Sequence, residues 1–212
     1  MSSARRFVLA ATLAFAGQAV MSSVVPQARA QEAAAVLTPA DRGWLARIED
    51  QLNTVTTLQA RFRQVAPDRA VTNGTVWLSR PGKMRFEYDK PSPLLLVASG
   101  GKVVFRDSQL DQTTEIPQER TPLGLLLGSH VAFSGPVTVT GFSHQGGFIH
   151  VTVVRTASPG DGSLTLVFRE APLALVSWTV LDAQGRQTEV SLSDIRPGAP
   201  APASLFVLPR GG

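Results

Sequence analysis

The chain has 212 residues, 43% of them hydrophobic, a composition that excludes intrinsic disorder and fits one domain or at most two small ones. It contains no cysteine, which excludes a disulfide framework, a thiolate zinc site, an iron–sulfur cluster, a catalytic cysteine and a lipid anchor on an N-terminal cysteine. Its 20 Lys and Arg against 16 Asp and Glu give a net charge of +4, which by itself suggests a nucleic-acid or membrane-surface partner.

Residues 1–30 have the pattern of an export signal. A basic start at Arg5 and Arg6 precedes a ten-residue, almost wholly apolar run, and a small-x-small site ends at Ala30. The run is too short to span a membrane, which takes about 20 residues. We therefore predict a secretory signal peptide that directs the chain to the periplasm by the Sec or the twin-arginine route and is cleaved after Ala30. Arg29 leaves with it, as do the first two arginines, so the net charge falls from +4 to +1 and the case for a nucleic-acid partner is lost.

The chain after the signal begins with a predicted helix. Residues 31–37 are rich in Ala without periodicity, and they are expected to form a flexible lead to the domain 38–212. Thr38 is a suitable N-cap and Pro39 suits the first helical position. Apolar residues then recur at three- and four-residue steps, which predicts one amphipathic helix running to about Gln64.

Beyond this helix the hydrophobic period changes to two, which is typical of strands. Short strands joined by turns, without helices between them, favour an antiparallel meander, so the fold class is α+β and mostly β. One segment, Thr121–Ser129, is apolar, begins with Thr-Pro and contains Gly, and it is predicted to be a short helix between strands. The predicted strands are Thr75–Ser79, Lys83–Tyr88, Leu94–Ser99, Lys102–Arg106, Asp111–Ile116, Val137–Phe142, Phe148–Arg155, Ser163–Phe168, Ala174–Leu181 and Gln187–Ile195, with Leu205–Leu208 as a candidate further strand.

No catalytic or metal-binding set stands out in the sequence. The three histidines fall on a turn (His130), a turn (His144) and a strand (His150), and none has a second His or a carboxylate at ligand spacing. Asp161 and Asp182 fall at turns, where Asp is expected for backbone reasons. No nucleophile elbow, Walker A loop or dinucleotide fingerprint is present. We expect neither an enzyme nor a cofactor.

The leucines of the predicted short helix are the most informative apolar residues. A meander with a single long helix can cover only part of a sheet face, so the remainder is either packed by curling of the sheet or left as a cavity. Leu123, Leu125, Leu126 and Leu127 would lie over such an opening. They either plug a filled half-barrel or form the lid of a ligand cavity, and composition alone leaves both readings open.

Two motifs carry a resemblance to a known family. The segment Phe62-Arg63-Gln64, followed by the Gly-Thr-Val-Trp-Leu-Ser-Arg-Pro-Gly-Lys-Met-Arg-Phe-Glu-Tyr block of residues 74–88, resembles the signature of the periplasmic outer-membrane lipoprotein carriers, the LolA family. The resemblance extends over about Thr38–Pro209. Further motifs follow in the family's order: Pro91, Leu95–Val97 before Gly100-Gly101-Lys102, Gln112-Thr113-Thr114, Thr121-Pro122-Leu123, Asp182-Ala183-Gln184-Gly185 and Leu205-Phe206-x-x-Pro209.

The resemblance implies a fold and a task. The fold is a curved, incomplete antiparallel barrel of about 10–11 strands whose mouth is covered by the helices. The task is to hold the acyl chains of a lipoprotein in an apolar cavity, after release from an inner-membrane ABC transporter and before delivery to an outer-membrane acceptor lipoprotein or to the outer membrane itself. The protein would act as a monomer, and the missing cysteine separates it from the lipid-anchored acceptor of the same fold. A periplasmic lipid-sensing regulator and an enzyme of this fold are the alternatives, although the regulator would need a second domain.

The resemblance also singles out site residues. It implies that Arg80, in Arg-Pro-Gly, lies under the lid and hydrogen-bonds to the lid backbone, the alternative being a strand-end arginine that stabilises a turn. Trp77, Met84 and Phe86 are, with the lid leucines, the expected cavity wall. Arg85 alternates to the opposite face and is expected to point outward.

Overall fold

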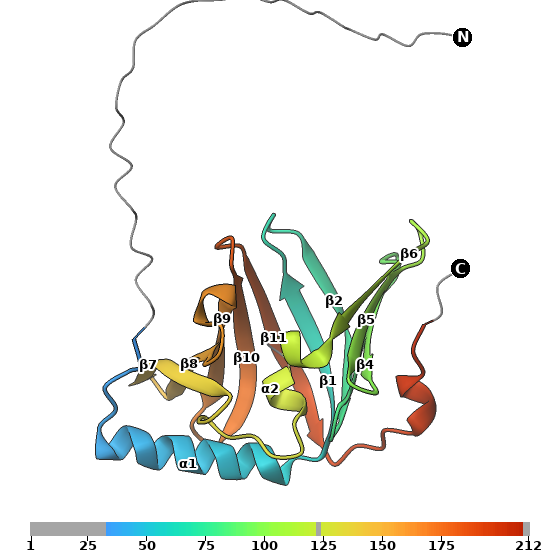
Figure 1. The fold of residues 1–212 in the computed structure, drawn as a ribbon. Helices are drawn as coiled ribbons and strands as arrows, with labels where there is room; N and C mark the ends of the chain where they lie inside the picture. Colours follow the sequence, from blue (N-terminus) through green and yellow to red (C-terminus); the bar gives the residue numbers. More distant parts are fainter. Residues whose placement is uncertain (1–32, 122–123, 210–212) are drawn as a thin grey trace, which may run out of the picture. The chain divides into compact units, whose positions relative to one another are not determined.

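The computed structural model describes residues 33–121 and 124–209, so the predicted signal peptide and Leu123 lie outside the described residues. These residues belong to one compact unit, Gln31–Gly212. The unit is one 11-stranded antiparallel sheet, curved and open, with a long helix across one end (Figure 1). This confirms the predicted fold class.

Helix α1, Pro39–Thr54, begins as its sequence predicts. The backbone N–H of Thr38 donates to Asp41 Oδ2 at 2.8 Å, and the N–H of Asp41 donates to the Thr38 hydroxyl at 3.2 Å. This reciprocal capping box satisfies two amides of the first turn that have no partner within the helix. The buried face of α1 consists of Leu45, Ile48 and Leu52.

The cap gives a pH-dependent prediction. The Thr38 backbone amide, followed by its hydroxyl, holds the pKa of Asp41 below its usual value. The carboxylate therefore stabilises the fold above its unfolded-chain pKa of about 3.9, and this contribution is lost as the pH falls through the lowered folded pKa. Asp41→Asn should be less stable than the wild type at pH 7 and equally stable once the pH is below that folded pKa, as measured by urea unfolding between pH 7 and 2. Asp50→Asn, near the other end of α1, is the control and should not destabilise, because an acid near a helix C-terminus is unfavourable. A gap for Asp41→Asn that persists unchanged at low pH would contradict the assignment.

The predicted extension of α1 to about Gln64 is wrong. The helix ends at Thr54, and Thr57–Val65 forms strand β1. The error has a simple cause: Leu58 and Phe62, four residues apart, fit a helical stripe as well as one face of a strand. The β-branched residues at 55–57 break the helix and favour the strand.

The strand bounds otherwise follow the predictions to within a few residues. The strands are β1 Thr57–Val65, β2 Val71–Ser79, β3 Lys83–Tyr88, β4 Leu94–Ser99, β5 Lys102–Asp107, β6 Gln112–Pro117, β7 Val137–Gln145, β8 Phe148–Arg155, β9 Gly162–Arg169, β10 Ala174–Asp182 and β11 Gln187–Pro197. The short helices are η1 Gln118–Arg120, α2 Gly124–Leu127, η2 Pro159–Asp161 and η3 Ala203–Phe206.

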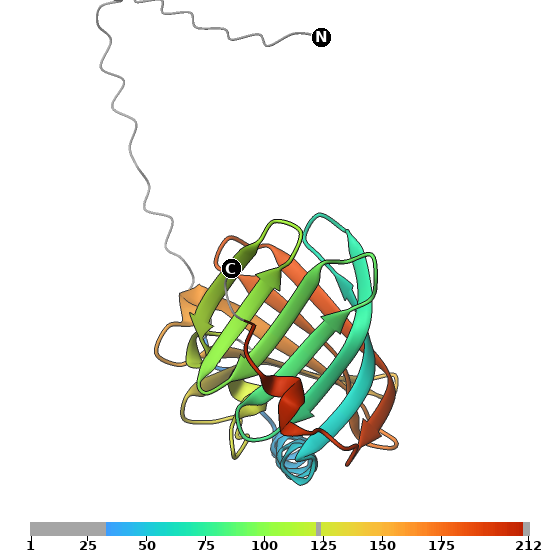
Figure 2. The same ribbon diagram turned by 90° about the vertical axis from the view of Figure 1, so that its right-hand side faces the viewer.

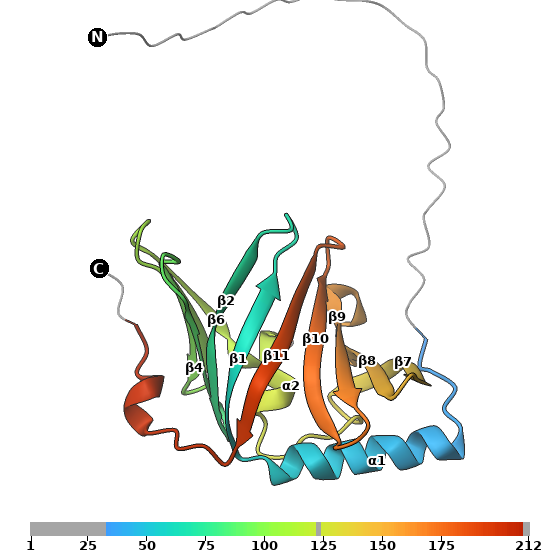
Figure 3. The same cartoon turned by 180° about the vertical axis from the view of Figure 1, so that it is seen from behind.

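The sheet consists of two meanders, β1–β6 and β7–β11, joined where β1 pairs with β11. The edge strands are β6 and β7, which do not pair with each other, so the curved sheet stays open on that side. The segment between these edges carries α2, which lies within the concavity of the sheet, whereas α1 crosses one end (Figures 1 and 3). The core lies between the concave face and the two helices, and its aromatic centre is Phe62, Phe86, Tyr88 and Trp178.

The C-terminal segment packs on the convex face. The candidate strand at residues 205–208 is not formed: its first two residues belong to η3, Ala203–Phe206, which lies across the outer face of β3 and β4 (Figure 2). Arg85 Nη1 donates to the Leu205 carbonyl at 3.2 Å, which agrees with the predicted outward direction of Arg85. Phe206 is 3% exposed although it lies outside the main core. The segment has no neighbouring strand to pair with there, so a helical turn satisfies its backbone locally.

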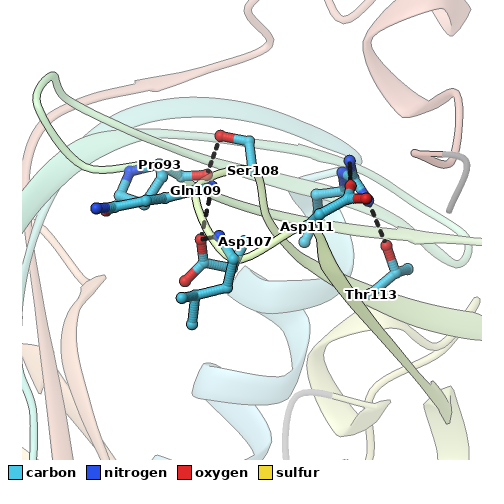
Figure 4. A network of polar contacts seen from close by, with 8 residues as sticks. Pro93, Asp107, Ser108, Gln109, Asp111 and Thr113 are labelled. Carbon is cyan, nitrogen blue, oxygen red and sulfur yellow. Dashed lines mark hydrogen bonds and ion pairs between the residues drawn. The ribbon is translucent and has the colours of Figure 1, made fainter. Parts of the chain in front are cut away.

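The turn between β5 and β6 is braced by polar contacts (Figure 4). Asp107 Oδ1 accepts from the backbone amides of Gln109 at 2.9 Å and Leu110 at 3.0 Å. The backbone amide and the hydroxyl of Ser108 each donate to the Pro93 carbonyl at 3.1 Å. These bonds hold the turn through its backbone, and the Leu110 side chain at the tip is 63% exposed. A substitution of Leu110 should therefore leave the packing of the protein unchanged.

Candidate functional site

Two cavities lie on either side of α2. The smaller, about 90 Å³, is bounded by side chains of α1, the central strands and α2, and apart from Gln51 and Arg80 its lining is apolar. The larger, about 320 Å³, lies between α2 and strands β7–β9. Leu126 lines the first cavity and its neighbour Leu125 the second, so α2 is the partition between them.

The structure brings most of the predicted cavity residues together around this partition. Arg80, Met84 and Leu126 line the smaller cavity, and Leu125 lines the larger. Phe86 and Leu127 face the same interior but are packed into the core, lining neither cavity. The leucines of α2 are therefore inserted into the concavity rather than laid over its rim.

Trp77 is not part of the cavity wall, contrary to the prediction. Its neighbours Val76 and Leu78 point into the core, and the alternation of side chains along a strand turns Trp77 to the outer face of β2. There it lies between Gln59 of β1 and Arg85 of β3 in the register of the sheet. The resemblance implied a cavity residue at this position, but the strand period determines the direction of its side chain.

Arg80 binds a different partner from the one that the resemblance implies. Its Nη1 donates to the carbonyl of Leu52, in the last turn of α1, and among the described residues of the lid it has no hydrogen-bond partner. Its Nε is buried without a partner among the described residues. Burial lowers the pKa of Arg80 below its usual value, because a desolvated guanidinium is less stable in its charged form. A charged group with free donor capacity thus borders an otherwise apolar cavity.

The contact with the lid backbone is made by the glycine of the same motif. The amide of Gly82 donates to the carbonyl of Leu127, the last residue of α2, at 2.8 Å. Gly82 has φ +74°, a left-handed conformation that favours glycine. The Arg-Pro-Gly turn between β2 and β3 therefore contacts both helices: α1 through Arg80 and α2 through Gly82.

Two polar residues of α1 hold the loop that follows α2, and sequence reasoning missed both. Asn53 is bidentate to the backbone of Val131: its Nδ2 donates to the carbonyl at 2.9 Å, and its Oδ1 accepts from the amide at 2.8 Å. Glu49 Oε1 accepts from the amide of Phe133 at 2.6 Å. Their i, i+4 spacing beside the apolar stripe of α1 was a signal, since it places both on one side of the helix facing the same neighbour.

The histidines offer no catalytic arrangement. His144 lies in β7, not in a turn as predicted, and its Nε2 is 3.0 Å from Glu170 Oε2 and its ring 4.9 Å from that of Trp44. Over residues 33–121 and 124–209, no three His, Cys, Asp or Glu side chains are grouped as metal ligands would be. Within the same ranges, no helix combines the length and the apolar character needed to cross a membrane.

Comparison with known proteins places this geometry in context. The family model described as outer membrane lipoprotein carrier protein LolA matches residues 53–209. An outer-membrane lipoprotein carrier protein of Methylococcus capsulatus is 31% identical over 169 residues, which cover 76% of this chain and 80% of the relative. One from Leptothrix cholodnii is 30% identical over 176 residues, covering 77% and 81%.

Solved structures are similar at lower identity. A LolA superfamily protein from Nitrosomonas europaea aligns with a TM-score of 0.43 at 11% identity, covering 77% of this chain and 97% of that chain. An uncharacterised conserved protein from Thermus thermophilus aligns with a TM-score of 0.47 at 15% identity, covering 80% and 94%.

Proposed function

Because the chain belongs to the LolA family of outer-membrane lipoprotein carrier proteins, a family of carriers rather than enzymes, we propose that it shields the acyl chains of lipoproteins in the periplasm and carries them to the outer membrane. The observation that carries the proposal is the concavity partitioned by α2, whose smaller cavity has an almost wholly apolar lining, while the larger cavity on the other side is bordered by charged residues such as Arg155 and Asp161.

The cavity sizes indicate how cargo would be held. Binding sites for small molecules usually measure about 300–1,000 Å³, so while α2 is in place the smaller cavity, about 90 Å³, is too small for an acyl chain, and the larger, about 320 Å³, is only at the lower end of that range. Withdrawal of α2 would join the two cavities and expose the faces that Leu126 and Leu127 now cover. Burial of an acyl chain is worth about 0.8 kcal/mol per methylene, so a chain of about 15 methylenes gains about 12 kcal/mol over water. This gain is measured against water and keeps loaded cargo from escaping into the periplasm; a chain that comes from a membrane is already buried, so it does not supply the energy to displace α2.

The proposed partners follow from this energy difference. A chain that gains so much from burial does not leave a membrane unaided, and the sequence contains no Walker A loop. An inner-membrane ABC transporter would supply the energy of loading, and an outer-membrane acceptor lipoprotein, or the membrane itself, would take the cargo. In this scheme Arg80, Met84 and the leucines of α2 form the site, with the partnerless Nε of Arg80 available to the ester oxygens of the cargo.

A charge placed in the concavity tests the proposal. Leu126, 5% exposed, lines the cavity, and Leu126→Asp should reduce uptake of a purified triacylated lipoprotein at least tenfold, because a carboxylate would have to be desolvated against the acyl chains. Uptake is measured by exchange from mild detergent followed by size-exclusion chromatography. Leu110→Asp, the same change at the exposed β5–β6 tip, should load normally. Equal loading by both variants, or no loading by the wild type, would refute the carrier role.

A further inference from the structure

We infer that the lid is hinged at its rear end: α2 swings out of the concavity to admit cargo, while the loop behind it remains fastened to α1 by Asn53 and Glu49. This rests on the proposed function and adds to it the direction of lid movement and two positioning residues. The rear loop is defined here as residues 128–136, between α2 and β7.

The rear loop is attached firmly. Three hydrogen bonds connect it to α1, two of them between Asn53 and the backbone of Val131 and one between Glu49 and the amide of Phe133. Both loop residues also have buried side chains, Val131 at 0% and Phe133 at 7% exposure. Detaching this loop would strand buried backbone groups without partners, which costs more than the hydrogen bonds themselves contribute.

The lid helix is attached more weakly. Among the hydrogen bonds of the described residues, one connects α2 to the sheet, from the Gly82 amide to the Leu127 carbonyl. Besides this bond, α2 is held by a hydrogen bond at its own front end, from the Gly124 amide to the Thr121 carbonyl at 3.0 Å, and by apolar packing, mainly the burial of Leu126 and Leu127. An acyl chain can take the place of the Leu126 and Leu127 side chains, because it makes apolar contacts of the same kind. It has no donor and acceptor that could replace the two hydrogen bonds between Asn53 and the backbone of Val131.

The asymmetry gives Asn53 and Glu49 their role. By fixing the rear loop they determine the position to which α2 returns when cargo leaves. Gly128, at the junction of α2 and the rear loop, lies where a Cβ would approach the His130 carbonyl to 3.0 Å, so the chain is tightly turned just behind the moving part. Asn53 and Glu49 need not contact the cargo to have this role.

Residue-resolved amide hydrogen exchange tests the direction of opening. Exchange is compared between the empty protein and the protein loaded with a synthetic N-acyl, S-diacylglyceryl lipopeptide. Loading should speed exchange of the Gly82 amide at least tenfold and leave the amides of Val131 and Phe133 unchanged, because only the first bonds to α2. A joint increase at all three amides would mean that the whole segment leaves, which overturns the hinge.

Other outcomes separate the two proposals. If the lipopeptide binds and no amide changes, the hinge is wrong and the carrier function stands. If the lipopeptide does not bind, the carrier function itself fails.

Asn53→Ala tests the positioning role. In the empty variant the Val131 amide should exchange at least tenfold faster, and bound lipopeptide should dissociate about tenfold faster, since the lid has lost its fixed support. Asn73→Ala, at an exposed position of β2, is the control for the residue type. Val151→Ala, at a fully buried position of β8, is the control for general destabilisation and should lower the melting temperature without altering dissociation. Faster dissociation from Val151→Ala, to the same extent, would show that stability alone explains the effect.

Discussion

Arg80→Leu should fold normally and release bound lipoprotein at least tenfold more slowly than the wild type. The substitution removes a half-buried guanidinium with a partnerless Nε and adds an apolar side chain to the lining of the smaller cavity. Burying a leucine side chain is worth about 1.5–3 kcal/mol, and this gain falls on the loaded state, where the side chain meets acyl chain rather than water. A difference of 1.4 kcal/mol corresponds to a factor of ten in release.

This variant should be modestly less stable than the wild type. Loss of the hydrogen bond to the Leu52 carbonyl costs about 1.5–3 kcal/mol because its donor is charged, and removal of a charge that burial disfavours offsets part of this cost. Release is measured as transfer of a labelled lipoprotein to an acceptor, and stability by urea unfolding. Arg63→Leu, at an exposed position of β1, is the matched control and should transfer at the wild-type rate. Wild-type transfer by Arg80→Leu would remove Arg80 from the mechanism.

Gly74→Ala should be strongly destabilising although it adds only one methyl group. Gly74 lies directly between Phe62 and Tyr88 in the register of β1, β2 and β3. A Cβ at this position would meet the carbonyl of Glu87 and approach the ring of Phe62 to 2.5 Å. The Phe62 ring occupies the space that a side chain at position 74 would need, and from there it makes edge-to-face contacts with Phe86 and Tyr88.

The expected loss is about 3 kcal/mol or more, at the upper end of the cost of overpacking, because a backbone carbonyl cannot move aside as a side chain can. This corresponds to roughly 6–12 °C in Tm for a chain of this size, measured by thermal unfolding. Gly43→Ala is the opposite control: nothing lies within 4 Å of its Cβ, and an alanine in α1 should stabilise by about 0.5–1 kcal/mol. A Gly74→Ala protein as stable as the wild type would show that the strand accommodates the methyl group.

Local features of the fold were readable from the sequence because local chemistry sets them. The Thr38 cap, the alternation along β3 and the Gly100-Gly101 turn, with φ +59° and +77°, are each determined within a few residues. The family resemblance, carried mainly by the block at residues 74–88, was confirmed by the family match over residues 53–209. Prediction from periodicity fails at Leu58 and Phe62, because a spacing of four residues fits one face of a helix and also one face of a strand. For this reason the predicted helix is too long.

The candidate site depended on contacts between distant parts of the chain. Arg80 and Leu52 are 28 residues apart, and Asn53 and Val131 are 78 apart. In each pair one partner is a backbone group, and because nearly every residue has the same backbone groups, the residue type does not reveal which one is bound. The side-chain partner could be suspected of a role, as Arg80 was, but its acceptor could not be named.

Strands β2 to β11, the start of α1, the apolar character of α2 and the family resemblance could be predicted from the sequence, because periodicity, capping and turn chemistry act over a few residues; β1 could not. Contacts between distant parts of the chain place β1 beside β11, make the face of β2 that carries Trp77 the outer one, join Gly82 to the last residue of α2 and fasten the loop behind α2 to α1, and none of these follows from local sequence. These depend on how the curved sheet brings distant backbone groups within hydrogen-bonding distance, and a carbonyl or an amide is the same in every residue except the amide of proline.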